Sequence, residues 1–251
     1  MIADAHIHIG WFNCPNKCGL KYHSPRRVIG VLNRSGVDAF IVSSTSAQAP
    51  GITLDGLYDE AREIEYLAGD RARQFLWVSR NIFQDDPALS LLDTGMYRGI
   101  KLHEQEGHWV QHHPSDLRRI LDVALARGLC VQFHSGPDRY CSPSALMAYA
   151  RLYADVKFDF AHCSPMDEMA SVIAQCDNVW TDTAYMRVDE FEHLRHFNWH
   201  KRLMYGSDFP VRQAYQCVSF TADYRNEINE MLRIGMSKDM DDAFNSFLRI
   251  K

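Results

Sequence analysis

Eight short runs of apolar and β-branched residues recur along the chain, and segments with a helical pattern of apolar residues separate them. Strands that alternate with helices long enough to cross back over a sheet indicate parallel pairing. Eight such units favour closure into a barrel over an open doubly wound sheet. The predicted strands are Ile2–Ile9, Ala39–Ser43, Gln74–Ser79, Gly99–His103, Leu129–His134, Val156–His162, Val179–Thr183 and Arg202–Asp208.

The length of the chain and the residues that begin and end its predicted helices agree with one α/β domain, a single (β/α)8 TIM barrel over residues 1–251. This barrel typically needs roughly 250 residues, and no linker, low-complexity tract or sequence repeat interrupts the chain. The first strand is not followed by a GxGxxG turn, which counts against a dinucleotide-binding fold. Helix starts are predicted at Pro114 and Pro143, and Gly128 is well placed to end the first of these helices.

Composition and charge favour a globular protein that acts on small molecules. The formal net charge of −5 gives no electrostatic reason to bind nucleic acid or an anionic membrane. Neither a membrane-spanning apolar run nor a secretory signal is visible in the sequence, so we expect a cytoplasmic protein without membrane or nucleic-acid partners. A homo-oligomer is compatible with the sequence.

The seven cysteines are an odd number, and most lie inside apolar runs, which is typical of reduced and buried thiols. Cys14 and Cys18, in the segment CPNKC, are the exception. They could pair, or hold a metal with outside help, but no second CxxC-like pair completes a thiolate zinc site. We interpret this segment as a loop with two free cysteines.

Polar side chains gather at the ends of the predicted strands, where a barrel of this kind has its active site. His6 and His8 lie on the same face of the first strand, because strand side chains alternate. His134 on the fifth strand and Asp208 on the eighth add a third imidazole and a carboxylate. Each residue alone has a structural explanation, but together they predict a Zn²⁺ site with an open coordination position for water.

Further polar and aromatic residues lie at or just past strand ends. Lys101, His103 and His162 are candidates for a second metal or for substrate contacts. For substrate binding the candidates are Trp11, Phe12, Arg80, Tyr185 and Arg212, although solvent exposure explains the arginines equally well and packing is the commoner role of the aromatic residues. We interpret the three loop histidines as surface residues, namely His108, His112 and His113.

The segments DAHIH, GIKLH, VQFHSG, DFAHCS and MYGSDFP, in this order, resemble the metal-dependent amidohydrolase superfamily. The chain is most similar to the amidohydrolase-related (amidohydrolase 2) branch, which includes aminocarboxymuconate-semialdehyde-decarboxylase-like proteins. The closing DDAFNSFLRI is similar to the terminal helix of the family, so the resemblance covers effectively the whole chain. It implies a (β/α)8 barrel in which His6, His8, His134 and Asp208 bind the metal.

The resemblance leaves several roles open. Asp208 would also be the proton shuttle, and His162 would be either a second-metal ligand or a catalytic residue. A lysine at the position of Lys101 is carboxylated in two-metal members, but in this branch it commonly occurs unmodified with one metal. We therefore favour one Zn²⁺ ion, with Mn²⁺ or a second ion as alternatives.

The implied activity is hydrolysis of a small amide, ester or lactone by a metal-activated water. The alternative within the same branch is a metal-dependent nonoxidative decarboxylase of a small unsaturated or aromatic acid. We rank it second because the chain has little room for long insertions that enclose such substrates. The third alternative is a barrel that binds metal without catalysis.

Overall fold

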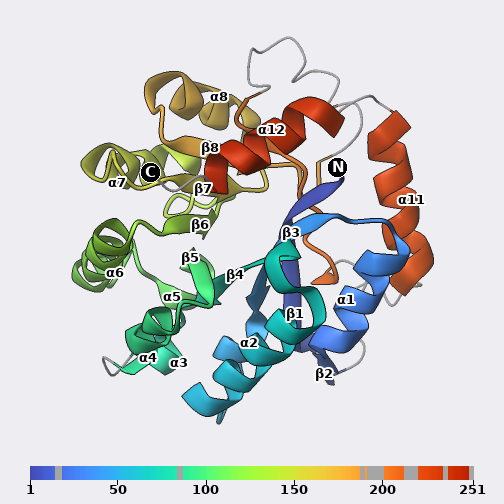
Figure 1. Ribbon diagram of the computed structural model, residues 1–251. Helices are drawn as coiled ribbons and strands as arrows, with labels where there is room; N and C mark the ends of the chain where they lie inside the picture. Colours follow the sequence, from blue (N-terminus) through green and yellow to red (C-terminus); the bar gives the residue numbers. More distant parts are fainter. Residues whose placement is uncertain are drawn as a thin grey trace. The chain divides into compact units, whose positions relative to one another are not determined.

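In a computed structural model, the protein has a mixed α/β fold made of two compact units (Figure 1). The first unit comprises Met1–Tyr97 with Gly206–Lys238, and the second comprises Arg98–Tyr205 with Asp239–Lys251. The structure describes residues 1–14, 19–83, 87–186, 190, 201–211, 220–233 and 237–248. None of the helices within these ranges has the length and apolar character needed to span a membrane.

The sheet of the first unit has the strand order β2-β1-β3-β4. Its parallel strands are β1 (Ala3–Cys14), β3 (Ala39–Ser44) and β4 (Ala72–Trp77), and β2 (Gly19–His23) pairs with β1 in the antiparallel direction. The main helices of this unit are α1 (Pro25–Arg34), α2 (Leu54–Ala68) and α11 (Phe220–Arg233). Its short helical segments are η1 (Thr45–Gln48), η2 (Gly69–Arg71), α3 (Arg80–Phe83), α4 (Pro87–Ser90) and η3 (Leu91–Thr94).

The second unit repeats the parallel strand and helix pattern. Its strands are β5 (Tyr97–Leu102), β6 (Cys130–His134), β7 (Phe158–Ala161), β8 (Val179–Asp182) and β9 (Leu203–Met204), hydrogen bonded in this order. Its helices are α5 (Glu104–Gly107), α6 (Pro114–Arg127), α7 (Pro143–Leu152), α8 (Met166–Gln175) and α12 (Ser237–Leu248).

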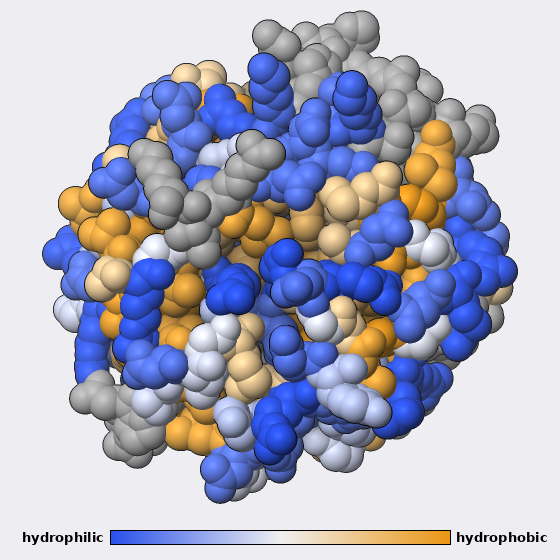
Figure 2. Space-filling view, viewed as in Figure 1, coloured by the Kyte–Doolittle hydropathy of each residue, from blue (hydrophilic) through white to orange (hydrophobic). Residues whose placement is uncertain are grey.

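On the face drawn in Figure 2, hydrophilic residues dominate the surface and hydrophobic residues show between them.

Local sequence signals set the helix ends. The hydroxyl of Ser24 accepts a hydrogen bond from the Arg27 amide, which caps the first turn of α1. Helix α6 begins at Pro114 as predicted, and Gly128 follows it in the left-handed conformation at φ 63°. Strands β7 and β8 are buried along their whole length, as expected of parallel strands covered on both faces.

All eight predicted strands are present, with ends that shift by a few residues, and the alternation of strands and helices is confirmed. The prediction missed β2 (GLKYH), a five-residue strand whose apolar residues Leu20 and Tyr22 are exposed. This strand forms by pairing with the extension of β1, where the rings of Trp11 and Tyr22 lie 5.0 Å apart. Closure into a complete barrel and a single-domain organisation stay predictions.

Gly10 in β1 has a φ of 98°, a conformation that a side chain disfavours. A Cβ atom there would lie 2.5 Å from Ser46 Oγ and 2.7 Å from Ser44 Oγ, and both hydroxyls donate to the Glu60 carboxylate. We expect Gly10→Ala to lower the free energy of unfolding by about 2–4 kcal/mol, from backbone strain and overpacking together.

Urea denaturation measures this loss, and Gly36→Ala is the matched control. Gly36 has a φ of 75°, but a Cβ there would meet no atom within 4 Å, so that variant isolates the backbone term. We expect the control to lose about 1–2 kcal/mol. An equal loss of unfolding free energy in the two variants would show that Ser44 and Ser46 move away from the added methyl group without an energetic cost.

Candidate metal centre

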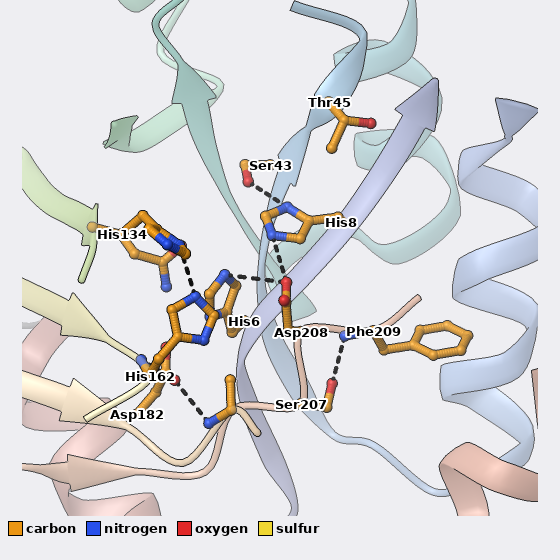
Figure 3. Close-up of polar contacts among 12 residues, drawn as sticks. His6, His8, Ser43, Thr45, His134, His162, Asp182, Ser207, Asp208 and Phe209 are labelled. Atoms are coloured by element: carbon orange, nitrogen blue, oxygen red, sulfur yellow. Dashed lines mark hydrogen bonds and ion pairs between the residues drawn. The ribbon is translucent and has the colours of Figure 1, made fainter. Parts of the chain in front are cut away.

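Strand β1 and the loop after β9 bring His6, His8 and Asp208 together in the first unit. Asp208 Oδ1 lies 2.9 Å from His8 Nε2 and 3.5 Å from His6 Nε2 (Figure 3). The three residues are buried, with exposed fractions of 1%, 2% and 5% for His6, His8 and Asp208. Each residue offers one atom that could bind a metal ion, and these three atoms lie within 4.8 Å of one another. Two imidazoles and a carboxylate in this arrangement suit a divalent metal ion.

His8 is held by neighbours that the sequence analysis did not single out. Its Nδ1 atom lies 3.0 Å from the hydroxyl of Ser43 at the end of β3, which leaves Nε2 directed at Asp208. The ring of Trp77, at the end of β4, lies 5.2 Å from the His8 ring. An outer partner that orients the ring is typical of metal-binding histidines.

The backbone around Asp208 is pinned to β1. The carbonyl oxygen of Phe209 accepts a 2.7 Å hydrogen bond from the His8 amide, and Phe209 N donates to Ser207 Oγ at 3.1 Å. Between these two anchored residues, Asp208 adopts a left-handed φ of 54°, which is unfavourable for a residue with a side chain. Tertiary hydrogen bonds therefore hold the carboxylate where it faces the two histidines.

Asp4 is a second buried carboxylate in this unit and was not predicted as a site residue. It accepts hydrogen bonds from the backbone amides of His6 and Ser207 and from the hydroxyls of Ser207 and Tyr224. Burial raises the pKa of Asp4 to about 7, although these hydrogen bonds favour the charged form. The signal available in the sequence was its place at the start of DAHIH.

A group of histidines forms in the second unit. His162 Nε2 lies 2.9 Å from His134 Nδ1, and the ring of His103 stacks on His134 with centroids 3.9 Å apart. His162 has a left-handed φ of 75°, and its backbone amide donates to Asp182 Oδ1 at 3.0 Å. The structure thus brings together three predicted site residues, His103, His134 and His162. It also shows that Asp182 holds the backbone amide of His162.

Lys101 lies in a buried acidic layer of the same unit. Its side chain is buried, as are those of Asp159 and Asp182. Burial and the charge of Asp182 raise the pKa of Asp159 well above its usual value, while Lys101 and the hydrogen bond from Gln132 Nε2 oppose this rise. The positive charge of Lys101 therefore favours the ionised form of Asp159.

A pocket of about 350 Å³ opens beside His134 and His162 in the second unit. Tyr185 lies on its wall, with its ring centroid 5.6 Å from that of His162 and a φ of 63°. The remaining described lining includes Gln105, Met166, Met186 and Glu190. The pocket therefore offers both apolar and hydrogen-bonding surface to a small molecule.

The other predicted residues lie in different surroundings. Trp11 is 39% exposed, whereas Phe12 is buried with its ring 5.0 Å from that of His23. Arg80 begins α3, and Arg212 lies outside the described residues. His108 and His112 are exposed and His113 is half-buried, which agrees with the interpretation of this loop as surface.

Four cysteines that the structure describes are free and buried, as predicted: Cys130, Cys141, Cys163 and Cys176. The pKa values of three of these thiols are raised, chiefly by burial, to about 12 for Cys130 and Cys163 and about 11 for Cys141. Cys18 and the side chain of Cys14 lie outside the described part of the chain.

Comparison with known proteins adds a family model described as amidohydrolase, which matches residues 4–216. Among solved structures, the fold is similar to that of the probable 2-pyrone-4,6-dicarboxylic acid hydrolase of Acinetobacter baumannii, solved with citric acid bound. The TM-score is 0.68 at 12% identity, with 98% of each chain covered. A protein of the same designation from Pseudomonas putida gives 0.67 at 15% identity, covering 98% of this chain and 96% of that one.

A third similar structure is 4-oxalomesaconate hydratase from Rhodopseudomonas palustris, with a TM-score of 0.56 at 12% identity and 98% of each chain covered. Identities this low show the fold alone. No curated protein sequence matches the chain.

Proposed function

The chain belongs to the amidohydrolase family, and from this premise we propose that it is a metal-dependent hydrolase of a small amide, ester or lactone. The family and its hydrolase and hydratase neighbours indicate an enzyme. The observation that carries the proposal is the buried triad of His6, His8 and Asp208, whose candidate ligand atoms lie within 4.8 Å of one another.

The donor set fits a divalent ion. The Asp208 carboxylate, on a side chain that is 8% exposed, faces two imidazole Nε2 atoms, and Ser43 contacts the far nitrogen of one of these rings. Desolvating such a carboxylate is costly unless positive charge compensates it, and a metal ion supplies that charge. We propose that His6, His8 and Asp208, joined by His134, hold one Zn²⁺ ion, for which imidazole and carboxylate ligands are typical.

In the proposed mechanism, a bound Zn²⁺ would supply hydroxide near neutral pH and polarise the carbonyl of the substrate, since it can lower the pKa of water from 15.7 to about 7. The Asp208 carboxylate accepts the proton of the attacking water and returns it to the leaving group. His162 donates a hydrogen bond to the developing oxyanion. His134, 2.9 Å from His162 Nε2, and Asp182, which holds the His162 amide, keep that ring in place.

Small molecules are the proposed substrates, because the net charge of −5 gives no electrostatic reason for a nucleic-acid partner. The pocket of about 350 Å³ beside His134 and His162 is within the range of small-ligand sites. Its lining of methionine, tyrosine and amide groups suits a compact ring or acyl group with a few polar atoms.

Metal analysis together with a substrate panel tests the proposal. The protein is expressed with added Zn²⁺ or Mn²⁺, and we expect about one tightly bound equivalent per chain. Lactones, esters and amides are then assayed beside unsaturated and aromatic acids with CO₂ detection. A metal content below about a tenth of an equivalent would overturn the metal site. Release of CO₂ without hydrolysis would replace the hydrolase with a decarboxylase.

A further inference from the structure

The carboxylate of Asp4 connects three distant parts of the first unit. Asp4 Oδ2 accepts hydrogen bonds from Ser207 Oγ at 2.6 Å and from Tyr224 Oη at 2.8 Å. Asp4 Oδ1 accepts the backbone amides of His6 at 3.0 Å and Ser207 at 3.1 Å. Asp4 and Tyr224 are both 0% exposed. Strand β1, the loop before Asp208 and helix α11 are thus joined through one buried group.

These bonds bracket the strained residue of the metal triad. On one side Ser207 is bound through both its amide and its hydroxyl, and the same hydroxyl accepts Phe209 N from the other side of Asp208. The φ of 54° at Asp208 persists only if the surrounding structure fixes it. Because Asp4 also holds the His6 amide, one carboxylate sets the position of a histidine and of the aspartate that faces it.

Tyr224 adds a bond that packing alone does not require. Its ring lies 4.5 Å from that of Phe209, a contact that a phenylalanine would make equally well. Its hydroxyl is aimed at Asp4 Oδ2 in a fully buried place, so the hydroxyl acts on the carboxylate that Ser207 also contacts. Tyr224 lies outside residues 4–216, to which the family model is matched, and therefore belongs to a part of this chain that the family signature does not assign.

We propose that Asp4 and Tyr224 are positioning residues, which act through Ser207 to hold Asp208 in its ligand orientation. The inference rests on the proposed function, because it takes His6, His8 and Asp208 as metal ligands. The docking of α11 is then coupled to the geometry of the metal centre through the hydroxyl of Tyr224. A residue with a structural role only would change stability and leave metal affinity unchanged.

Tyr224→Phe tests the coupling, with Tyr153→Phe as the matched control. Tyr153 Oη donates to Asp122 Oδ1 at 2.9 Å in the second unit, so the control also removes a phenol–carboxylate hydrogen bond. Zn²⁺ dissociation constants are measured by competition with a chromogenic chelator, and visible absorption spectra are recorded for the Co²⁺ forms. Thermal unfolding of the metal-free proteins gives the stability change of each variant.

We expect Tyr224→Phe to weaken Zn²⁺ binding about 3–10-fold and to shift the Co²⁺ bands, whereas Tyr153→Phe keeps the affinity within about twofold and the spectrum unchanged. Ser207→Ala is the second variant, to be used if Tyr224→Phe does not fold. It replaces a smaller side chain and should weaken Zn²⁺ binding about 10–100-fold. The inference would be overturned, and the proposed function left standing, if Tyr224→Phe (or Ser207→Ala where that variant is used) kept the wild-type Zn²⁺ affinity and Co²⁺ spectrum. Equal shifts in Tyr224→Phe and Tyr153→Phe would have the same meaning. An unmodified chain that binds neither Zn²⁺ nor Co²⁺ would overturn the proposed function together with it.

Discussion

Replacing Asp208 with Asn is expected to reduce kcat/KM about 10²–10⁴-fold on any substrate that the protein hydrolyses. The amide has nearly the same size as the carboxylate, but it can neither accept the proton of the attacking water nor return it to the leaving group. It also removes the negative charge that faces His6 and His8 at 3.5 and 2.9 Å. Steady-state kinetics of metal-loaded protein measure the loss, with metal content determined on the same samples.

Asp38→Asn is the control for this variant. Asp38 is an exposed aspartate of the same unit, and its Oδ2 atom accepts the Ile2 amide at 2.7 Å. Its replacement should leave kcat/KM within about twofold, since substitutions at exposed positions rarely reach a distant site. Full activity of Asp208→Asn at full metal content would remove Asp208 from the proton transfer and leave it, at most, as a ligand.

His8→Ala should lower the affinity for Zn²⁺ by more than about 100-fold, because even outer partners of metal ligands account for 10–100-fold. The side chain of His8 is 3% exposed and directs Nε2 at Asp208, while Nδ1 contacts the hydroxyl of Ser43. Dialysis against a weak chelator followed by metal analysis measures the loss. A ligand that binds only the folded state raises the melting temperature, so added Zn²⁺ should stabilise the unmodified protein and not this variant.

The exposed His112 provides the matching control, since His112→Ala removes an imidazole from the surface loop. We expect that variant to keep the metal and to melt as the unmodified protein does. If His8→Ala retained a full equivalent of Zn²⁺ after dialysis, the histidine pair of β1 would not be the core of the metal centre.

The parts of the site that follow from strand periodicity could be predicted from sequence. His6 and His8 share a face because strand side chains alternate, and both lie in β1 as predicted. Asp208 could be found because it ends the last of eight regularly spaced runs. By contrast, β2 forms by pairing with an extension of β1 and leaves its apolar residues Leu20 and Tyr22 exposed.

The supports of the site could not be predicted, because their chemistry depends on contacts across the sequence. Asp4 and Ser207 are 203 residues apart, and Asp4 and Tyr224 are 220 apart. Nothing local marks Asp4 as an acceptor of four hydrogen bonds. The left-handed backbone of Asp208 is equally hidden, since aspartate adopts a positive φ only occasionally and the His8–Phe209 bond that helps to fix it here joins distant segments.

The first unit is assembled from Met1–Tyr97 and Gly206–Lys238, segments separated by more than a hundred residues of the second unit. A ribosome therefore delivers His6 and His8 first, and their carboxylate partner only after the whole of Arg98–Tyr205 has been made. A nascent chain that stops before Gly206 carries two imidazoles without the group that faces them. Under the proposed metal site, loading therefore follows the synthesis of Asp208, and a product truncated before it cannot assemble the triad.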